Sequence, residues 1–175
     1  MRPIVTEEDK RLVGYLKKKK GPSNPSRVHV YYNRGVKKGG GYLTGKFYSN
    51  KNKKTYTYRS SYELRYFQML EEDTTVVSYE SEAMKIPYKD FDGKYKNYIP
   101  DLMILRSDGS IEVCEIKPEA MLDNGIVKRK AQACQSYFYK LLGKSDIKYA
   151  YKFITEKALF KDNLEYTEFL SKHSR

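Results

Sequence analysis

The stretch that decides the fold is YIPDLMILRSDGSIEVCEIK, residues 98–117. Two runs rich in apolar and β-branched residues predict strands over Lys96–Leu105 and Ser110–Lys117. The turn sequence Ser107-Asp108-Gly109 between them predicts an antiparallel hairpin.

Three charged residues interrupt the apolar faces of these strands. Side chains alternate along a strand, so Asp101 shares a face with apolar residues, and so do Glu115 and Lys117. Those apolar neighbours are Ile99, Met103 and Leu105 on the first strand and Ile111 and Val113 on the second. Burying a charge costs several kcal/mol unless it is paired or binds a metal. Two explanations stay open: a structural Glu115–Lys117 ion pair with Asp101 near solvent, or a reactive site.

The length of the hairpin loop decides whether the two carboxylates meet. A two-residue turn would pair Ser107 with Ser110 and send Asp101 and Glu115 to opposite faces. A three-residue loop would pair Arg106 with Ser110 and place the carboxylates opposite each other on one face. The longer loop is favoured, because its third position takes a left-handed residue and Gly109 stands there.

The surrounding sequence predicts a compact α/β domain over residues 45–175, preceded by an arm over residues 1–44. A capping box of Ser60 and Glu63 predicts the start of the first helix of the domain. The other expected elements are strands Lys54–Arg59, Val76–Tyr79, Ala83–Tyr88 and Lys148–Thr155, and helices Asp9–Lys19 (in the arm), Ser60–Glu72, Val127–Leu142 and a C-terminal one.

Positive charge is concentrated in the first third of the chain. The net charge is +12, yet no carboxylate occurs between Lys10 and Tyr62. This predicts a nucleic-acid partner, because each phosphate contact releases condensed counterions; a solvated tail that aids solubility is the alternative. The candidate DNA-contacting residues are Lys17, Lys18, Lys19, Lys20, Arg34, Lys37, Lys38, Lys53, Lys54 and Arg59.

Several classes of protein are excluded by composition. No apolar run approaches the ~18 residues of a membrane helix, so we expect no membrane partner. Cys114 and Cys134 cannot form a disulfide framework, and with only His29 and His173 a zinc-type ligand spacing is missing. We therefore expect a cytoplasmic protein with reduced thiols.

The order of motifs resembles the PD-(D/E)XK nuclease superfamily. Pro100-Asp101 followed by Glu115-Ile116-Lys117 matches its central pattern. The wider context, Tyr58–Glu63, Ser81-Glu82 and Ile86-Pro87-Tyr88, resembles TnsA-type endonucleases and is similar to phage head-completion nucleases and phage homing-type endonucleases. The resemblance covers about residues 45–155.

The resemblance implies a restriction-endonuclease-like α/β core, in which helices flank a mixed central sheet with an antiparallel hairpin. It implies that Asp101, Glu115 and the carbonyl of Ile116 coordinate Mg²⁺ or Mn²⁺, hard cations that prefer oxygen. Lys117 would orient the attacking water, and Glu63 would complete the site, although the capping box is its rival role. Gln135, in a Gln-x-x-x-Tyr pattern, would support the site.

Three functions are compatible with these features. The first is a metal-dependent endonuclease acting on double-stranded DNA, phage-encoded and of the homing type. The second is a head-completion or DNA-end-binding protein that keeps the nuclease fold. The third, an RNA-binding protein, explains the charge but not the buried Asp101, Glu115 and Lys117. A second copy of the chain or a phage structural protein is left open as a partner.

Overall fold

The computed structural model describes residues 31–32, 43–143 and 145–173. They form two compact units, one over residues 75–153 and one that joins the described residues before 75 to those after 153. The expected helix Asp9–Lys19 lies outside the described residues.

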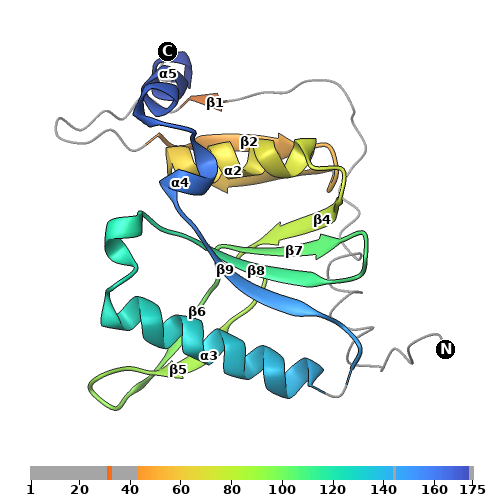
Figure 1. Cartoon of the computed structure of the whole chain (residues 1–175), viewed down its shortest axis with the longest axis vertical. Helices are drawn as coiled ribbons and strands as arrows, with labels where there is room; N and C mark the ends of the chain where they lie inside the picture. The colour runs from red at the N-terminus through yellow and green to blue at the C-terminus, as the bar shows by residue number, and fades with distance from the viewer. Residues whose placement is uncertain (1–30, 33–42, 144, 174–175) are drawn as a thin grey trace. The chain divides into compact units, whose positions relative to one another are not determined.

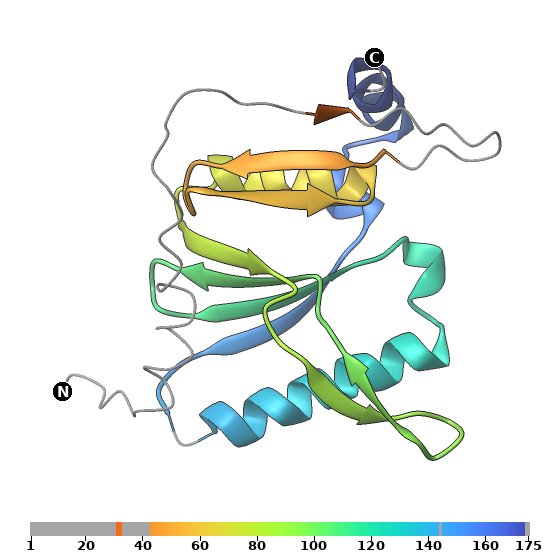
Figure 2. The same ribbon diagram turned by 180° about the vertical axis from the view of Figure 1, so that it is seen from behind.

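The first unit is built on a four-stranded mixed sheet. Its strands are β4 (Val76–Ser81), β7 (Leu102–Arg106), β8 (Ile111–Ile116) and β9 (Tyr149–Ile154), in the order β4-β7-β8-β9. β7 is antiparallel to both β4 and β8, whereas β9 runs in the same direction as β8 (Figures 1 and 2). This mixed sheet, with its central hairpin and flanking helix, confirms the expected fold class.

The strand expected over Lys96–Leu105 is wrong as a single element. The structure divides it into β6 (Tyr95–Tyr98), which pairs with β5 (Ile86–Lys89) in a separate two-stranded ribbon, and β7. The break contains Pro100, which has no N–H to donate to a sheet ladder. Ile99 is consequently 39% exposed, so it does not lie on the buried face that alternation predicted.

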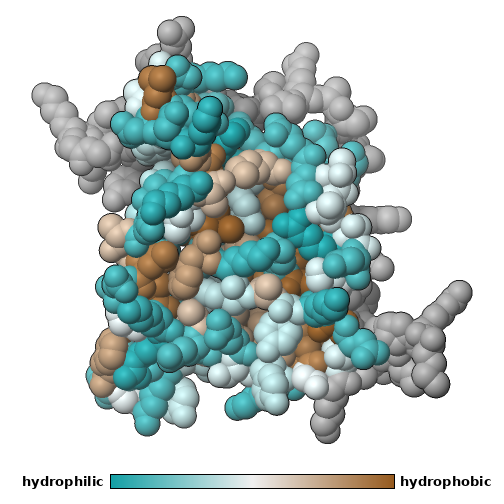
Figure 3. Space-filling view, in the orientation of Figure 1, coloured by the Kyte–Doolittle hydropathy of each residue, from teal (hydrophilic) through white to brown (hydrophobic). Residues whose placement is uncertain are grey.

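Helix α3 (Gly125–Leu142) packs against one face of this sheet. Its buried residues Cys134, Phe138 and Leu142 share a core with Met103 and Val113 of the hairpin. The helix begins two residues before the expected Val127, because the side chain of Asn124 caps the N–H of Ile126 at 2.9 Å. Its outer face is mainly hydrophilic (Figure 3). A short 3-10 helix, Glu119–Met121, precedes it.

The second unit contains an antiparallel sheet of β1 (Tyr31–Tyr32), β2 (Gly45–Ser49) and β3 (Lys54–Tyr58). Helix α2 (Ser61–Glu72) covers one face of it. The ring of Phe67 stacks on Phe47 and Tyr56, with centroids 5.5 and 5.4 Å away. Offset aromatic pairs of this kind stabilise a small core beyond their buried area.

The C-terminal segment forms two helices where one was expected, α4 (Glu156–Leu159) and α5 (Asn163–His173). Phe160 adopts an extended backbone between them, and its ring packs against Tyr62 and Tyr166. The carboxylate of Asp162 then accepts the N–H of Glu165 at 2.9 Å, which starts the second helix. No helix among the described residues is both long and apolar enough to span a bilayer.

Candidate active site

The hairpin of β7 and β8 has the register that brings the two carboxylates together. Its ladder pairs Leu102 with Cys114 and Leu105 with Ile111. The loop has three residues: the N–H of Arg106 donates to the carbonyl of Ser110 at 2.9 Å, and Gly109 takes a φ of +83°. The prediction of a three-residue loop closed by a left-handed glycine is confirmed.

Asp101 lies opposite Glu115, one position beyond the first pair of the ladder. The N–H of Ile116 donates to Asp101 Oδ2 at 2.7 Å, which ties Asp101 to the end of β8. The Glu115 side chain is 5% exposed, whereas Asp101 is 30% exposed. The Glu115 carboxylate is therefore buried, whereas the Asp101 carboxylate is partly open to solvent.

Lys117 brings a positive charge to both carboxylates. Its Nζ lies 3.1 Å from Glu115 Oε1 and 4.0 Å from Asp101 Oδ2. The Glu115–Lys117 ion pair, which a purely structural role would explain, is thus present. Lys117 also approaches Asp101, a contact that this explanation does not include. Two carboxylates facing one ammonium leave a formal charge of −1, an environment that attracts a further cation.

Two tyrosines form the layer behind Glu115. The hydroxyl of Tyr98 donates to Glu115 Oε2 at 2.6 Å, and the hydroxyl of Tyr151 lies 2.9 Å from that of Tyr98. Burial, reinforced by the charge of Glu115, raises the pKa of Tyr98 far above its usual value. Burial also raises the pKa of Tyr151, so both remain proton donors at neutral pH. Sequence reasoning missed both, because unbroken alternation would place Tyr98 on the face opposite to Asp101, and Tyr151 belongs to a strand far along the chain.

Helix α3 contributes Cys134 and Lys130 to the surroundings of the site. Burial, together with the charge of Glu115, raises the pKa of Cys134 to about 12, so its thiol is neutral at pH 7. Lys130 Nζ lies 5.6 Å from the centroid of the Tyr98 ring. Gln135 is exposed, one helical position after Cys134. Its supporting role stays a prediction.

Glu63 belongs to the second unit, where it caps helix α2. Ser60 Oγ accepts the N–H of Glu63 at 3.1 Å, and Glu63 Oε2 accepts the N–H of Arg59 at 2.8 Å. The predicted capping role is therefore confirmed. Its role as a metal ligand stays a prediction.

The donor set of the hairpin fits a hard divalent cation. Asp101 and Glu115 supply carboxylate oxygens, and their combined charge exceeds that of Lys117. Within the described ranges, no group of three His, Cys, Asp or Glu residues gathers into a metal site. The carbonyl of Ile116 and the carboxylate of Glu63 stay the further predicted donors.

The predicted DNA-contacting residues fall into two sets. Lys53 and Arg59 are exposed on the second unit, and the half-buried Lys54 places its Nζ 4.8 Å from the centroid of the Tyr56 ring. The others lie outside the described residues: Lys17, Lys18, Lys19, Lys20, Arg34, Lys37 and Lys38.

A mixed sheet whose central hairpin carries two carboxylates and a lysine defines the class of protein, that of the PD-(D/E)XK-type nucleases. Residues 73–163 match the family model described as TnsA-like endonuclease N terminal, and the chain belongs to this family. The matched region contains Tyr98, Asp101, Glu115 and Lys117. No curated protein matches the chain.

Proposed function

We propose that the protein is a divalent-metal-dependent endonuclease that hydrolyses phosphodiester bonds of double-stranded DNA with an activated water. One observation carries this proposal: Asp101 and Glu115 lie opposite each other, and both face Lys117. Membership of a TnsA-like endonuclease family supports DNA cleavage as the reaction.

In this proposal Asp101, Glu115 and the carbonyl of Ile116 hold Mg²⁺ or Mn²⁺. A bound dication supplies Lewis acidity and lowers the pKa of a coordinated water. Lys117 orients that water and offsets the charge that develops on the scissile phosphate. The products would carry 5′-phosphate and 3′-hydroxyl ends, as in the related nucleases.

Other predicted residues extend the site. Glu63 adds a ligand, direct or through water, and Gln135 supports the hairpin side chains. The arm over residues 1–44 adds phosphate contacts to a nuclease domain over residues 45–175 through its lysines and arginines. A phage-encoded, homing-type role rests on resemblance alone and stays a prediction.

The test is cleavage of a supercoiled plasmid, with DNA binding followed in parallel by fluorescence anisotropy. We expect nicking or linearisation in Mg²⁺ and none in EDTA. Asp101→Asn and Lys117→Ala should lose cleavage by at least about 10²-fold while binding survives. Matched controls are Asp123→Asn, on a fully exposed carboxylate, and Lys140→Ala, on the outer face of α3.

Three results would contradict the proposal. Cleavage that persists in EDTA would show that the reaction needs no divalent metal. Cleavage that persists in both site variants would show that the hairpin residues do not carry the reaction. A wild-type protein that binds DNA ends in Mg²⁺ and Mn²⁺ without cutting them is a DNA-end-binding module on a nuclease fold.

A further inference from the structure

We propose that Tyr98, supported by Tyr151, is the positioning residue that fixes the orientation of the Glu115 carboxylate, which would be a ligand of the metal ion. This inference rests on the proposed metal-dependent function and describes how the proposed metal ligand, Glu115, is held in position. Tyr98 would touch neither metal nor DNA; it would act through Glu115.

The direction of the hydrogen bonds follows from the chemistry of the groups. An ionised carboxylate only accepts, so the hydroxyl of Tyr98 donates to Glu115 Oε2 at 2.6 Å. The oxygen of Tyr98 is then free to accept from the hydroxyl of Tyr151 at 2.9 Å. The result is a directed chain from Tyr151 through Tyr98 to Glu115.

The chain makes the two oxygens of Glu115 unequal. Oε2 is taken by a short, charge-assisted hydrogen bond, while Oε1 faces the ammonium of Lys117 at 3.1 Å. A carboxylate without this bond could rotate and present either oxygen. Fixing the rotation before the ion binds lowers the entropic cost of binding, so the bond should raise metal affinity.

Tyr98 packs in the core in a way that does not depend on its hydroxyl. Tyr98 is 2% exposed, its backbone pairs with that of Ile86 across the ribbon, and it belongs to the hydrophobic core that includes Val113 and Phe138. The hydroxyl itself bonds to Glu115 and Tyr151. Replacing Tyr98 by Phe therefore keeps the packing and removes the one atom that reaches Glu115.

The experiment measures Mn²⁺ binding to the full chain without DNA, by isothermal titration calorimetry and by the electron paramagnetic resonance signal of free Mn²⁺. Tyr98→Phe should weaken Mn²⁺ binding by about 10- to 100-fold, the usual effect of losing a partner that orients a ligand. Tyr151→Phe should weaken it by about fivefold, the net effect of one neutral hydrogen bond. Matched controls are Tyr88→Phe on the same ribbon and Tyr149→Phe on the same strand as Tyr151; both should bind as wild type.

A kinetic measurement separates positioning from damage to the fold. Tyr98→Phe should raise the Mg²⁺ concentration needed for half-maximal cleavage by the same factor, and cleavage at saturating Mg²⁺ should stay within a few-fold of wild type. A structural defect would lower the saturated rate and leave the half-saturating concentration unchanged.

The outcomes distinguish this inference from the proposed function. If wild type binds Mn²⁺ and Tyr98→Phe binds equally well, the inference is overturned and the nuclease function stands. If wild type binds no Mn²⁺, both are overturned. Should Tyr98→Phe fail to fold, unchanged Mn²⁺ affinity in Tyr151→Phe would overturn the inference by itself.

Discussion

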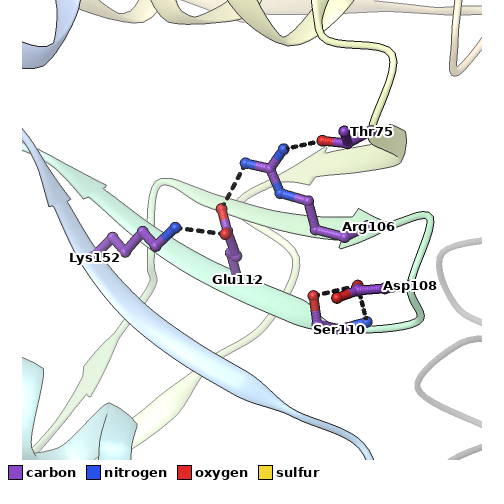
Figure 4. A network of polar contacts seen from close by, with 6 residues as sticks. All are labelled: Thr75, Arg106, Asp108, Ser110, Glu112 and Lys152. Carbon is purple, nitrogen blue, oxygen red and sulfur yellow. Dashed lines mark hydrogen bonds and ion pairs between the residues drawn. The ribbon is translucent and has the colours of Figure 1, made fainter.

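Arg106 donates to Glu112 at 2.9 Å on the face of the hairpin opposite to Asp101 and Glu115. Lys152 of β9 reaches the other oxygen of Glu112 at 2.5 Å, and Arg106 also donates to the hydroxyl of Thr75 at 2.6 Å (Figure 4). One buried carboxylate thus ties three strands of the sheet. The network lies on the opposite face of the sheet from the candidate site and holds together the strands on which the site residues lie.

Replacing Glu112 by Gln should lower the free energy of unfolding by about 1–3 kcal/mol, because two charge-assisted hydrogen bonds lose their ionised acceptor. Urea denaturation followed by circular dichroism measures the change. The control Asp123→Asn, on an exposed pair with Lys128, should stay within about 0.5 kcal/mol of wild type. An equal loss of unfolding free energy in both variants would show that the network stabilises the protein no more than an exposed ion pair does.

Stability should also depend on pH through Glu112. Burial alone would raise the pKa of this carboxyl, but the hydrogen bonds from Arg106 and Lys152 outweigh burial and lower the pKa below its usual value. A depressed folded-state pKa gives stability that is present above the unfolded-state value and is lost as the pH falls through the folded one. Wild type should therefore lose more stability than Glu112→Gln as the pH falls below the ordinary glutamate pKa of about 4.3. Parallel curves for the two proteins would show that Glu112 titrates normally.

The left-handed Gly109 should be sensitive to substitution. Its φ is +83°, and a Cβ placed there would meet no atom within 4 Å, so the cost of Gly109→Ala is purely that of the backbone. We expect a loss of about 1–2 kcal/mol in thermal or urea unfolding. Ser107→Ala, in the same exposed loop, is the control. Wild-type stability for Gly109→Ala would mean that the loop adopts another geometry in solution.

The basic arm should make DNA binding depend strongly on salt. Replacing Lys17–Lys20 together by Gln should weaken binding and reduce the slope of log K against log salt by up to about 3.6, since each phosphate contact contributes about 0.9. Anisotropy titrations between 50 and 200 mM salt measure both. The control is a fourfold Gln variant of lysines that are exposed in the described part of the chain: Lys140, Lys148, Lys161 and Lys172. The same slope of log K against log salt in both variants would show that the arm makes no phosphate contacts and serves solubility or binds another protein.

The sequence by itself determined the features that depend on neighbours along the chain. Gly109 set the loop length and hence the register that places Asp101 opposite Glu115, because only a left-handed residue fits the third loop position. Ser60 and Glu63 marked the start of helix α2 for a similar reason, since a cap satisfies the first N–H groups of its own helix.

Only the tertiary structure decided what lies behind the carboxylates. The bond between Tyr98 and Tyr151 joins residues 53 positions apart, and no periodic pattern predicts such a contact. Pro100 marks a break that the sequence contains, but the partners on either side of it are tertiary: β6 pairs with β5, and β7 pairs with β4 and β8. Local steric preferences fix turns and caps, whereas packing of distant strands selects the side chains that meet at a site.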